Sequence, residues 1–129
     1  MVRADLTIPA SKHVYTVGEE LCVELRIFND DDHAVEIECV RDIYPMGFDY
    51  IRINPGNLIE TERTLMLYRR LCQGELLCIE LILKAKQPGS YIWSPVIIYR
   101  KGGDKVSCPV ATVKLVVEGG SRSRPEWGP

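Results

Sequence analysis

The chain has 129 residues, of which 46% are hydrophobic and 26% charged, and its formal net charge is −2. This length suits one domain with its own core, and the composition is that of a folded protein, not of a disordered one. The near balance of charge gives no electrostatic reason for a nucleic acid or an anionic membrane as the main partner, so we expect no nucleic-acid binding.

The N-terminal residues are not followed by the apolar stretch of a secretory signal. No segment approaches the roughly 20 apolar residues that cross a bilayer, and we expect no membrane insertion. The expected location is the cytoplasm for the chain as written, or the cell surface if the chain is a domain excised from a longer protein.

Apolar and polar side chains alternate with a period of two along most of the chain. In one example, Leu21, Val23, Leu25 and Ile27 are separated by single, mostly polar residues. This alternation is typical of a strand with one buried face, and Gly- and Pro-rich turns separate the segments that show it. We predict seven to nine strands, at about residues 5–9, 13–17, 21–28, 34–42, 48–53, 59–68, 75–84, 90–99 and 106–118.

Many short alternating strands predict an all-β fold. Their number favours an immunoglobulin-like β-sandwich of two antiparallel sheets with Greek-key connections. We expect the sandwich to span residues 1–118. Residues 119–129 combine Gly, Ser, Arg and Pro without periodicity and are predicted to form a flexible C-terminal tail or linker.

The order of the turn and strand-edge signals is similar to that of known domains. These signals are Val14–Glu19, Asn29, Asp42, Pro45–Gly47, Gln73–Glu75 and Pro88–Tyr91. Over about residues 6–118 the chain resembles the immunoglobulin-like repeat domains of archaeal and bacterial surface proteins, including the CARDB-like group. It also resembles the N-terminal sandwich of proteins that accompany MoxR-type ATPases and von Willebrand A-like domains. Both resemblances imply the same sandwich fold.

The five cysteines lack the close pairs of a zinc ribbon or a small disulfide-rich domain. If strands 21–28 and 75–84 are antiparallel neighbours, Cys22 and Cys78 are about 16 Å apart, and a disulfide needs Cα atoms within ~7 Å. We therefore expect free thiols, and we expect Cys39 to be a small core residue.

No catalytic, cofactor-binding or metal-binding residues are predicted, and we expect a protein that is not an enzyme and has no cofactor. The two histidines are His13 and His33. His33 and Cys39 are separated by about six residues at ~3.3 Å each, which is beyond hydrogen-bond reach. The run Asp30–Asp32 lacks the spacing of a calcium loop, so we expect a solvated turn in which Asn29 binds its own backbone.

Three predicted connections fall at one end of the sandwich: 29–33, 69–73 and 100–104. Loops at such an end often carry function, because the strands hold them rigidly and leave their sequence free. The sequence therefore predicts a protein-interaction module with an unidentified protein partner. The alternative is a structural spacer or adhesion repeat of a prokaryotic cell-surface protein, with an ordinary mixed-charge surface at this end. The predicted contact residues are Asp30, Asp31, Asp32, Arg69, Arg70, Arg100 and Lys101.

Overall fold

The computed structural model describes residues 1–8, 12–56 and 58–119. This part of the chain contains twelve β-strands and no helix, so the predicted all-β fold is confirmed. In chain order the strands are β1 (Val2–Thr7), β2 (Val14–Thr16), β3 (Glu20–Asn29), β4 (Val35–Arg41), β5 (Phe48–Asn54), β6 (Ile59–Thr61), β7 (Thr64–Leu71), β8 (Leu76–Ala85), β9 (Gly89–Trp93), β10 (Val96–Lys101), β11 (Asp104–Pro109) and β12 (Val113–Glu118).

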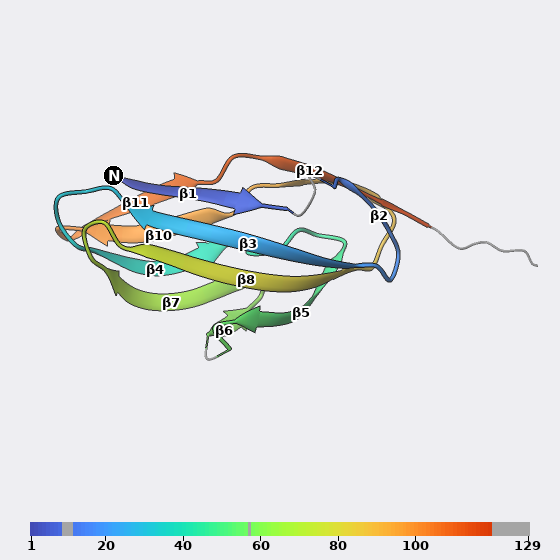
Figure 1. Cartoon of the computed structure of the whole chain (residues 1–129), viewed down its shortest axis with the longest axis horizontal. Coiled ribbons are helices and arrows are strands. Elements are labelled where there is room, and N and C mark those ends of the chain that lie inside the picture. Colours follow the sequence, from blue (N-terminus) through green and yellow to red (C-terminus); the bar gives the residue numbers. More distant parts are fainter. Residues whose placement is uncertain (9–11, 57, 120–129) are drawn as a thin grey trace, which may run out of the picture.

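The strands form a sandwich of two layers. A four-stranded sheet of order β1-β3-β8-β5 makes one layer. A five-stranded sheet, β11-β10-β4-β7-β6, and a three-stranded sheet, β2-β12-β9, make the other. These two sheets are halves of one layer, because the chain passes directly from β9 into β10 and from β11 into β12 (Figure 1).

The structure has more strands than the sequence predicted, because three predicted strands are each divided. Pro95 separates β9 from β10, and proline has no N–H to donate to a neighbouring strand. Its carbonyl accepts a 2.8 Å hydrogen bond from the N–H of Val110, which lies in the break between β11 and β12. The two breaks therefore lie side by side. The third division is the turn at Glu62 and Arg63 between β6 and β7.

One strand pair is parallel, whereas the predicted sandwich had only antiparallel sheets. β2 pairs in parallel with β12, whereas β1 pairs antiparallel with β3 in the opposite layer. The N-terminal segment thus changes layer between β1 and β2.

The core confirms the alternation predicted for the two long central strands. β3 and β8 are antiparallel neighbours, with Val23 opposite Leu81 and Leu25 opposite Ile79. All four side chains have no exposed surface. Burial of a leucine or isoleucine side chain contributes roughly 1.5–3 kcal/mol, so these strands supply much of the stability that holds the ends of the sandwich in place.

The prediction that Cys39 is a small core residue is wrong, because β4 is irregular at this point. The register shifts between Ile37 and Cys39 on the side of β7, and a second shift occurs on the side of β10. A bulge reverses which residues of a strand face inward. Val40 is therefore fully buried, and Cys39 is only partly buried on the opposite face.

All five cysteines are free. Cys22 lies opposite Ile82, and Cys78 lies opposite Arg26. These two thiols are thus four positions apart along the paired strands, about 13 Å, which is less than the about 16 Å expected from the sequence and still beyond the reach of a disulfide.

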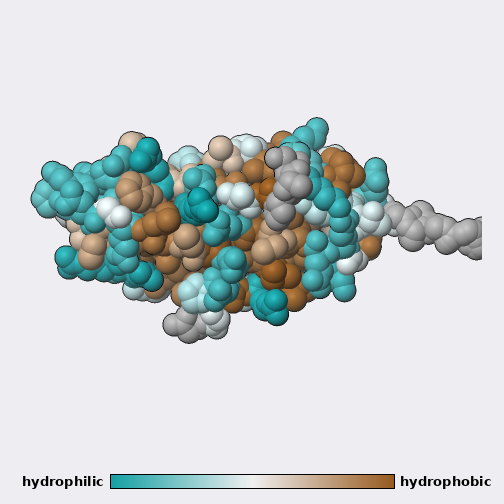
Figure 2. Space-filling model, viewed as in Figure 1, coloured by the Kyte–Doolittle hydropathy of each residue, from teal (hydrophilic) through white to brown (hydrophobic). Residues whose placement is uncertain are grey.

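Hydrophilic residues cover the end of the molecule at the left of Figure 2, while hydrophobic residues reach the surface near the middle. No helix within the described ranges has the length and apolarity of a membrane span. The predicted tail, residues 119–129, lies outside the described residues apart from Gly119.

Candidate interaction site at the loop end

Three turns meet at one end of the sandwich, at the left of Figure 1. They are the β3–β4 turn, the β7–β8 turn and the β10–β11 turn, and we call this region the loop end. Lys101 of the third turn places its Nζ 2.8 Å from Oδ1 of Asp31 in the first. The N–H of Gly74 in the second turn donates to the carbonyl of Asn29, at 2.9 Å. The structure therefore brings together the three connections that were expected at one end.

Asn29 joins two of these turns from a fully buried position. Its Nδ2 donates to the carbonyls of His33 and Leu71, at 2.9 and 3.0 Å. Its Oδ1 accepts a 2.9 Å hydrogen bond from the N–H of Asp31, which is the local turn contact expected from the sequence. Because Leu71 ends β7, this side chain fixes the first turn against the neighbouring strand.

Each of the three aspartates of the first turn has a partner: Asp30 and Asp31 form ion pairs, and Asp32 contacts the His33 ring. The hydrogen bond from Lys101 lowers the pKa of the Asp31 carboxyl, and the contact with His33 lowers the pKa of Asp32. Paired carboxylates of this kind offer little free charge to a partner. The pairs are Asp30 with Arg3 at 3.5 Å, Asp31 with Lys101 at 2.8 Å and with the N-terminal amino group at 3.2 Å, and Asp32 with His33 at 2.7 Å.

Two of the three arginines at this end are also paired. Arg69 contacts Glu75 at 2.6 Å. Arg100 pairs with Glu38 and lowers the pKa of that carboxyl, and its Nη1 donates to the carbonyl of Gly103 at 3.1 Å. Arg70 makes no ion pair or side-chain hydrogen bond with any residue that the structure describes.

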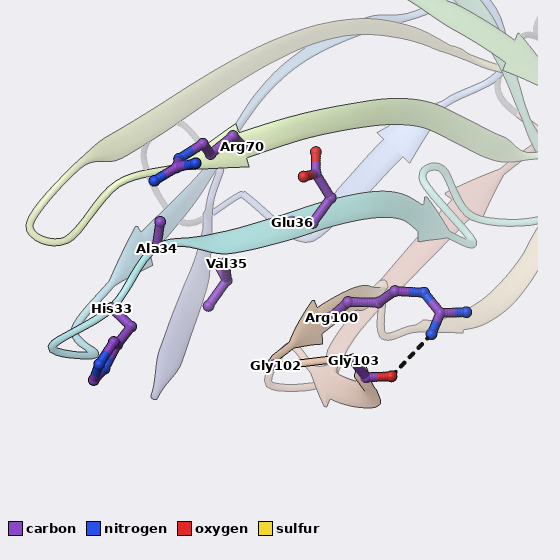
Figure 3. A pocket seen from close by; sticks show the side chains of 8 residues that line it. All are labelled: His33, Ala34, Val35, Glu36, Arg70, Arg100, Gly102 and Gly103. Atoms are coloured by element: carbon purple, nitrogen blue, oxygen red, sulfur yellow. Dashed lines mark hydrogen bonds between the residues drawn. The ribbon is translucent and has the colours of Figure 1, made fainter.

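Arg70 belongs to a row of charged residues across four strands. It lies opposite Glu36 of β4, which lies opposite Arg100 of β10, which in turn lies opposite Lys105 of β11. Figure 3 shows Glu36 on its strand between Arg70 and Arg100. Neighbouring strands are about 4.8 Å apart, so the row spans roughly 14 Å of the sheet.

An open groove of about 370 Å³ lies beside this row. It is lined by residues 33–36, Arg70, Arg100, Gly102 and Gly103 (Figure 3). The two glycines have φ angles of 57° and 93°, the left-handed values of a two-residue hairpin turn that glycine adopts without strain. With Ala34, they keep this part of the wall free of large side chains.

The sequence analysis did not identify Glu36, His33 or the glycine pair as parts of a site. Glu36 fell within the predicted strand 34–42 without a role, and His33 was considered only for a catalytic pair with Cys39. These residues come together only because β4 pairs with both β7 and β10. A prediction of strand positions does not say which strands pair. The Gly102–Gly103 turn was visible in the sequence, but only as a turn.

The carboxylates and cysteines of the described ranges do not converge on a metal centre. Within these ranges, no group of three or more His, Cys, Asp and Glu side chains is placed to hold an ion. His13 contacts the carbonyl of Lys114 in β12, whereas His33 lies at the loop end.

No family model and no curated protein matches the chain. Among solved structures, the cupredoxin domain of amoB from Nitrosocaldus yellowstonii is similar over 98% of this chain and 94% of its own, with 14% identity and a TM-score of 0.60. The PapD-like domain 7 of human CEP192 matches over 93% and 87%, with 10% identity and a TM-score of 0.55. A non-cellulosomal cohesin from Archaeoglobus fulgidus matches over 91% of each chain, with 10% identity and a TM-score of 0.53.

These similarities show the fold, because the identities are low. They confirm a β-sandwich of the immunoglobulin-like, cupredoxin, cohesin and PapD-like kind, and they do not single out either family named from the sequence. A cupredoxin-type copper site uses two histidines and a cysteine. Here His13 precedes β2 and contacts Lys114 of β12, whereas His33 lies in the β3–β4 turn at the loop end, so the likeness to the cupredoxin domain does not extend to such a site.

Proposed function

We propose that this domain is a non-enzymatic interaction module that binds an acidic segment of a partner protein at the groove of the loop end. One observation carries the proposal: of the seven contact residues predicted from the sequence, Arg70 alone has no partner among the described residues. The other six would have to give up an internal contact before they could bind a partner: an ion pair for five of them, and the hydrogen bond to His33 for Asp32. Arg70 can bind without that cost.

The chemistry of the groove favours a carboxylate-bearing partner. The guanidinium of arginine presents its donors in a planar fork that matches a carboxylate. Among the residues that line the groove, Arg70 and Arg100 carry two positive charges, against one negative charge on Glu36. One positive charge is therefore in excess, although the whole chain has a net charge of −2.

The shape of the groove favours a peptide over a small molecule. Small-molecule sites enclose most of their ligand and have mainly apolar walls. This groove is open along one side, and three of its eight lining residues, Glu36, Arg70 and Arg100, are charged. The sandwich fold shared with a PapD-like domain and a cohesin is consistent with an interaction or structural module.

A structural spacer or adhesion repeat, as in the prokaryotic surface domains that the sequence resembles, is the second candidate. The observation that favours it is the internal pairing of six of the seven predicted residues, since a spacer needs a well-neutralised surface and no recognition site.

The experiment compares Arg70→Glu with a matched control, Arg52→Glu. Arg52 is an exposed arginine of β5 that also lacks an ion pair within the described residues, and it lies in the other layer. Each variant is used as bait in quantitative affinity capture from cells of the source organism. We expect Arg70→Glu to reduce recovery of the partner at least tenfold and Arg52→Glu to leave it unchanged. Equal recovery with both variants, or no protein enriched by any bait, would support the spacer instead.

A further inference from the structure

The three-stranded sheet has an outer face with exposed apolar side chains. This outer face consists of the outward residues of β2, β12 and β9: Val14, Thr16, Lys114, Val116, Glu118, Ser90 and Ile92. Ile92 is 77% exposed and Val14 is 46% exposed. Their strand neighbours Tyr15, Leu115 and Trp93 face the core and are buried.

A shallow, mainly apolar groove of about 490 Å³ lies beside β12 and the start of β2, and it is lined by His13, Thr112, Val113, Lys114 and Val116. Val116 lies opposite both Val14 and Ser90, and Lys114 lies opposite Ile92. The apolar side chains therefore form one patch across three strands. Adjacent apolar side chains of this kind differ from the singly scattered apolar residues that are normal on a protein surface.

The charges at the rim of this patch are unpaired. Neither the ammonium of Lys114 nor the carboxylate of Glu118 has an ion-pair partner among the residues described. The two residues are four positions apart on β12, about 13 Å along the strand, so they cannot reach one another within one molecule. Val116 lies midway between them.

This arrangement is self-complementary, and we propose that the outer face of the three-stranded sheet binds a second copy of the chain. A twofold axis that lies between the two faces and crosses β12 at Val116 sets the two β12 strands antiparallel. Lys114 of each copy then faces Glu118 of the other, and Val116 and Val14 face their own counterparts. Isologous contacts of this kind are the commonest in homodimers.

The same charges exclude the other orientation. If the axis ran along the strand, Lys114 would face Lys114 and Glu118 would face Glu118, and like charges placed directly opposite are destabilising. Stacked sheets lie about 10 Å apart, a gap that two valine side chains fill and that lysine and glutamate side chains can bridge. The charge pattern thus selects both the occupant and its direction.

The size of the face predicts a weak dimer. The three strands have three, five and six residues. At ~4.8 Å between strands and ~3.3 Å per residue, they cover at most roughly 14 by 20 Å. A stable dimer buries about 800 Å² on each partner, and this face is smaller. We therefore expect a dissociation constant on the order of 100 µM. No residue of the loop end takes part in this contact.

The test uses sedimentation equilibrium of the full chain up to about 1 mM. We expect a monomer–dimer equilibrium for the natural sequence. Lys114→Glu should weaken it at least tenfold, and so should Glu118→Lys, because each creates like-charge pairs. The double variant K114E/E118K should return to within threefold of the natural affinity. An equimolar mixture of the two single variants should associate, since their charges are complementary. Arg70→Glu is the matched control and should change nothing.

Ile92→Glu provides a second probe that does not depend on the ion pairs, and it should abolish dimerisation. All these positions are exposed, so circular dichroism and urea midpoints should stay as in the natural chain. A monomer at 1 mM would overturn the proposal and assign the face to another occupant. Dimers that persist in both single charge variants would overturn it as well. Neither result would affect the proposed groove at the loop end.

Discussion

Replacement of Asn29 by alanine should destabilise the domain by about 2–4 kcal/mol. Alanine removes three side-chain hydrogen bonds, to the carbonyls of His33 and Leu71 and from the N–H of Asp31. Each is worth roughly 0.5–1.5 kcal/mol net, so the three together are worth about 2–4 kcal/mol, and the extra cost of a backbone group left buried without a partner places the loss toward the upper end. The contact with Leu71 is buried, so its carbonyl is the group that carries this extra cost.

The assay is urea unfolding followed by far-UV circular dichroism, with Asn54→Ala as the matched control. Asn54 is exposed and makes one side-chain hydrogen bond, to Glu80 at 3.2 Å, so its loss should cost less than about 0.5 kcal/mol. Asn29→Asp is a second variant, and it keeps an oxygen for the N–H of Asp31 but points a carboxylate at two carbonyls. It should be at least as unstable as the alanine variant. Midpoints for Asn29→Ala and Asn54→Ala that coincide would refute the reasoning.

Three further predictions concern the core, the charges and the thiols. Leu81→Ala should cost about 2–5 kcal/mol of unfolding free energy, because this side chain is fully buried. Leu76→Ala, at a position 49% exposed, should cost under about 1 kcal/mol. Equal urea midpoints for the two variants would contradict this prediction. The pKa of Asp31 is lowered in the folded state, chiefly by its hydrogen bond to a lysine, so its contribution to stability is full above the usual pKa of 3.8 and is lost as the pH falls below it. Asp31→Asn should therefore reduce the difference between urea midpoints at pH 6 and pH 3, and an unchanged difference would count against the pair. Cys22 and Cys78 should both be alkylated in the native protein, and a disulfide between them in non-reducing mass spectrometry would show that the register of β3 and β8 is wrong.

The sequence predicted the features of the fold that depend on local alternation. Leu25 and Leu81 face the core because each lies in a long strand with strict period-two spacing. The pairing considered for those strands is also observed, since β3 and β8 are antiparallel neighbours and Cys22 and Cys78 do not face each other.

Features that depend on contacts between distant strands were not predicted. The bulge that turns Cys39 from the core arises where β4 must match both β7 and β10, and nothing near Cys39 in the sequence signals it. The break at Pro95 was visible as a proline, but its effect on the strand count depends on the adjacent break at Val110.

The candidate site was also predicted only in part. The meeting of three turns followed from strand order, and the seven charged residues lie at or near that end as expected. Their internal pairing could not be read from the sequence, because it depends on the positions of partners such as Arg3, Glu38 and Glu75. That pairing reduces a broad charged surface to a groove with one free arginine.

A residue-resolved titration of the ¹⁵N-labelled chain with acetylated hexaglutamate tests the central claim most directly. We expect the largest amide shifts at residues 33–36, at Arg70 and at residues 100–103, which line the groove. The shifts should shrink as salt rises, because exposed charges are screened at ionic strengths above about 0.1 M. They should vanish in Arg70→Glu and persist in Arg52→Glu. Shifts that are spread evenly over the surface, or that remain in Arg70→Glu, would contradict the account.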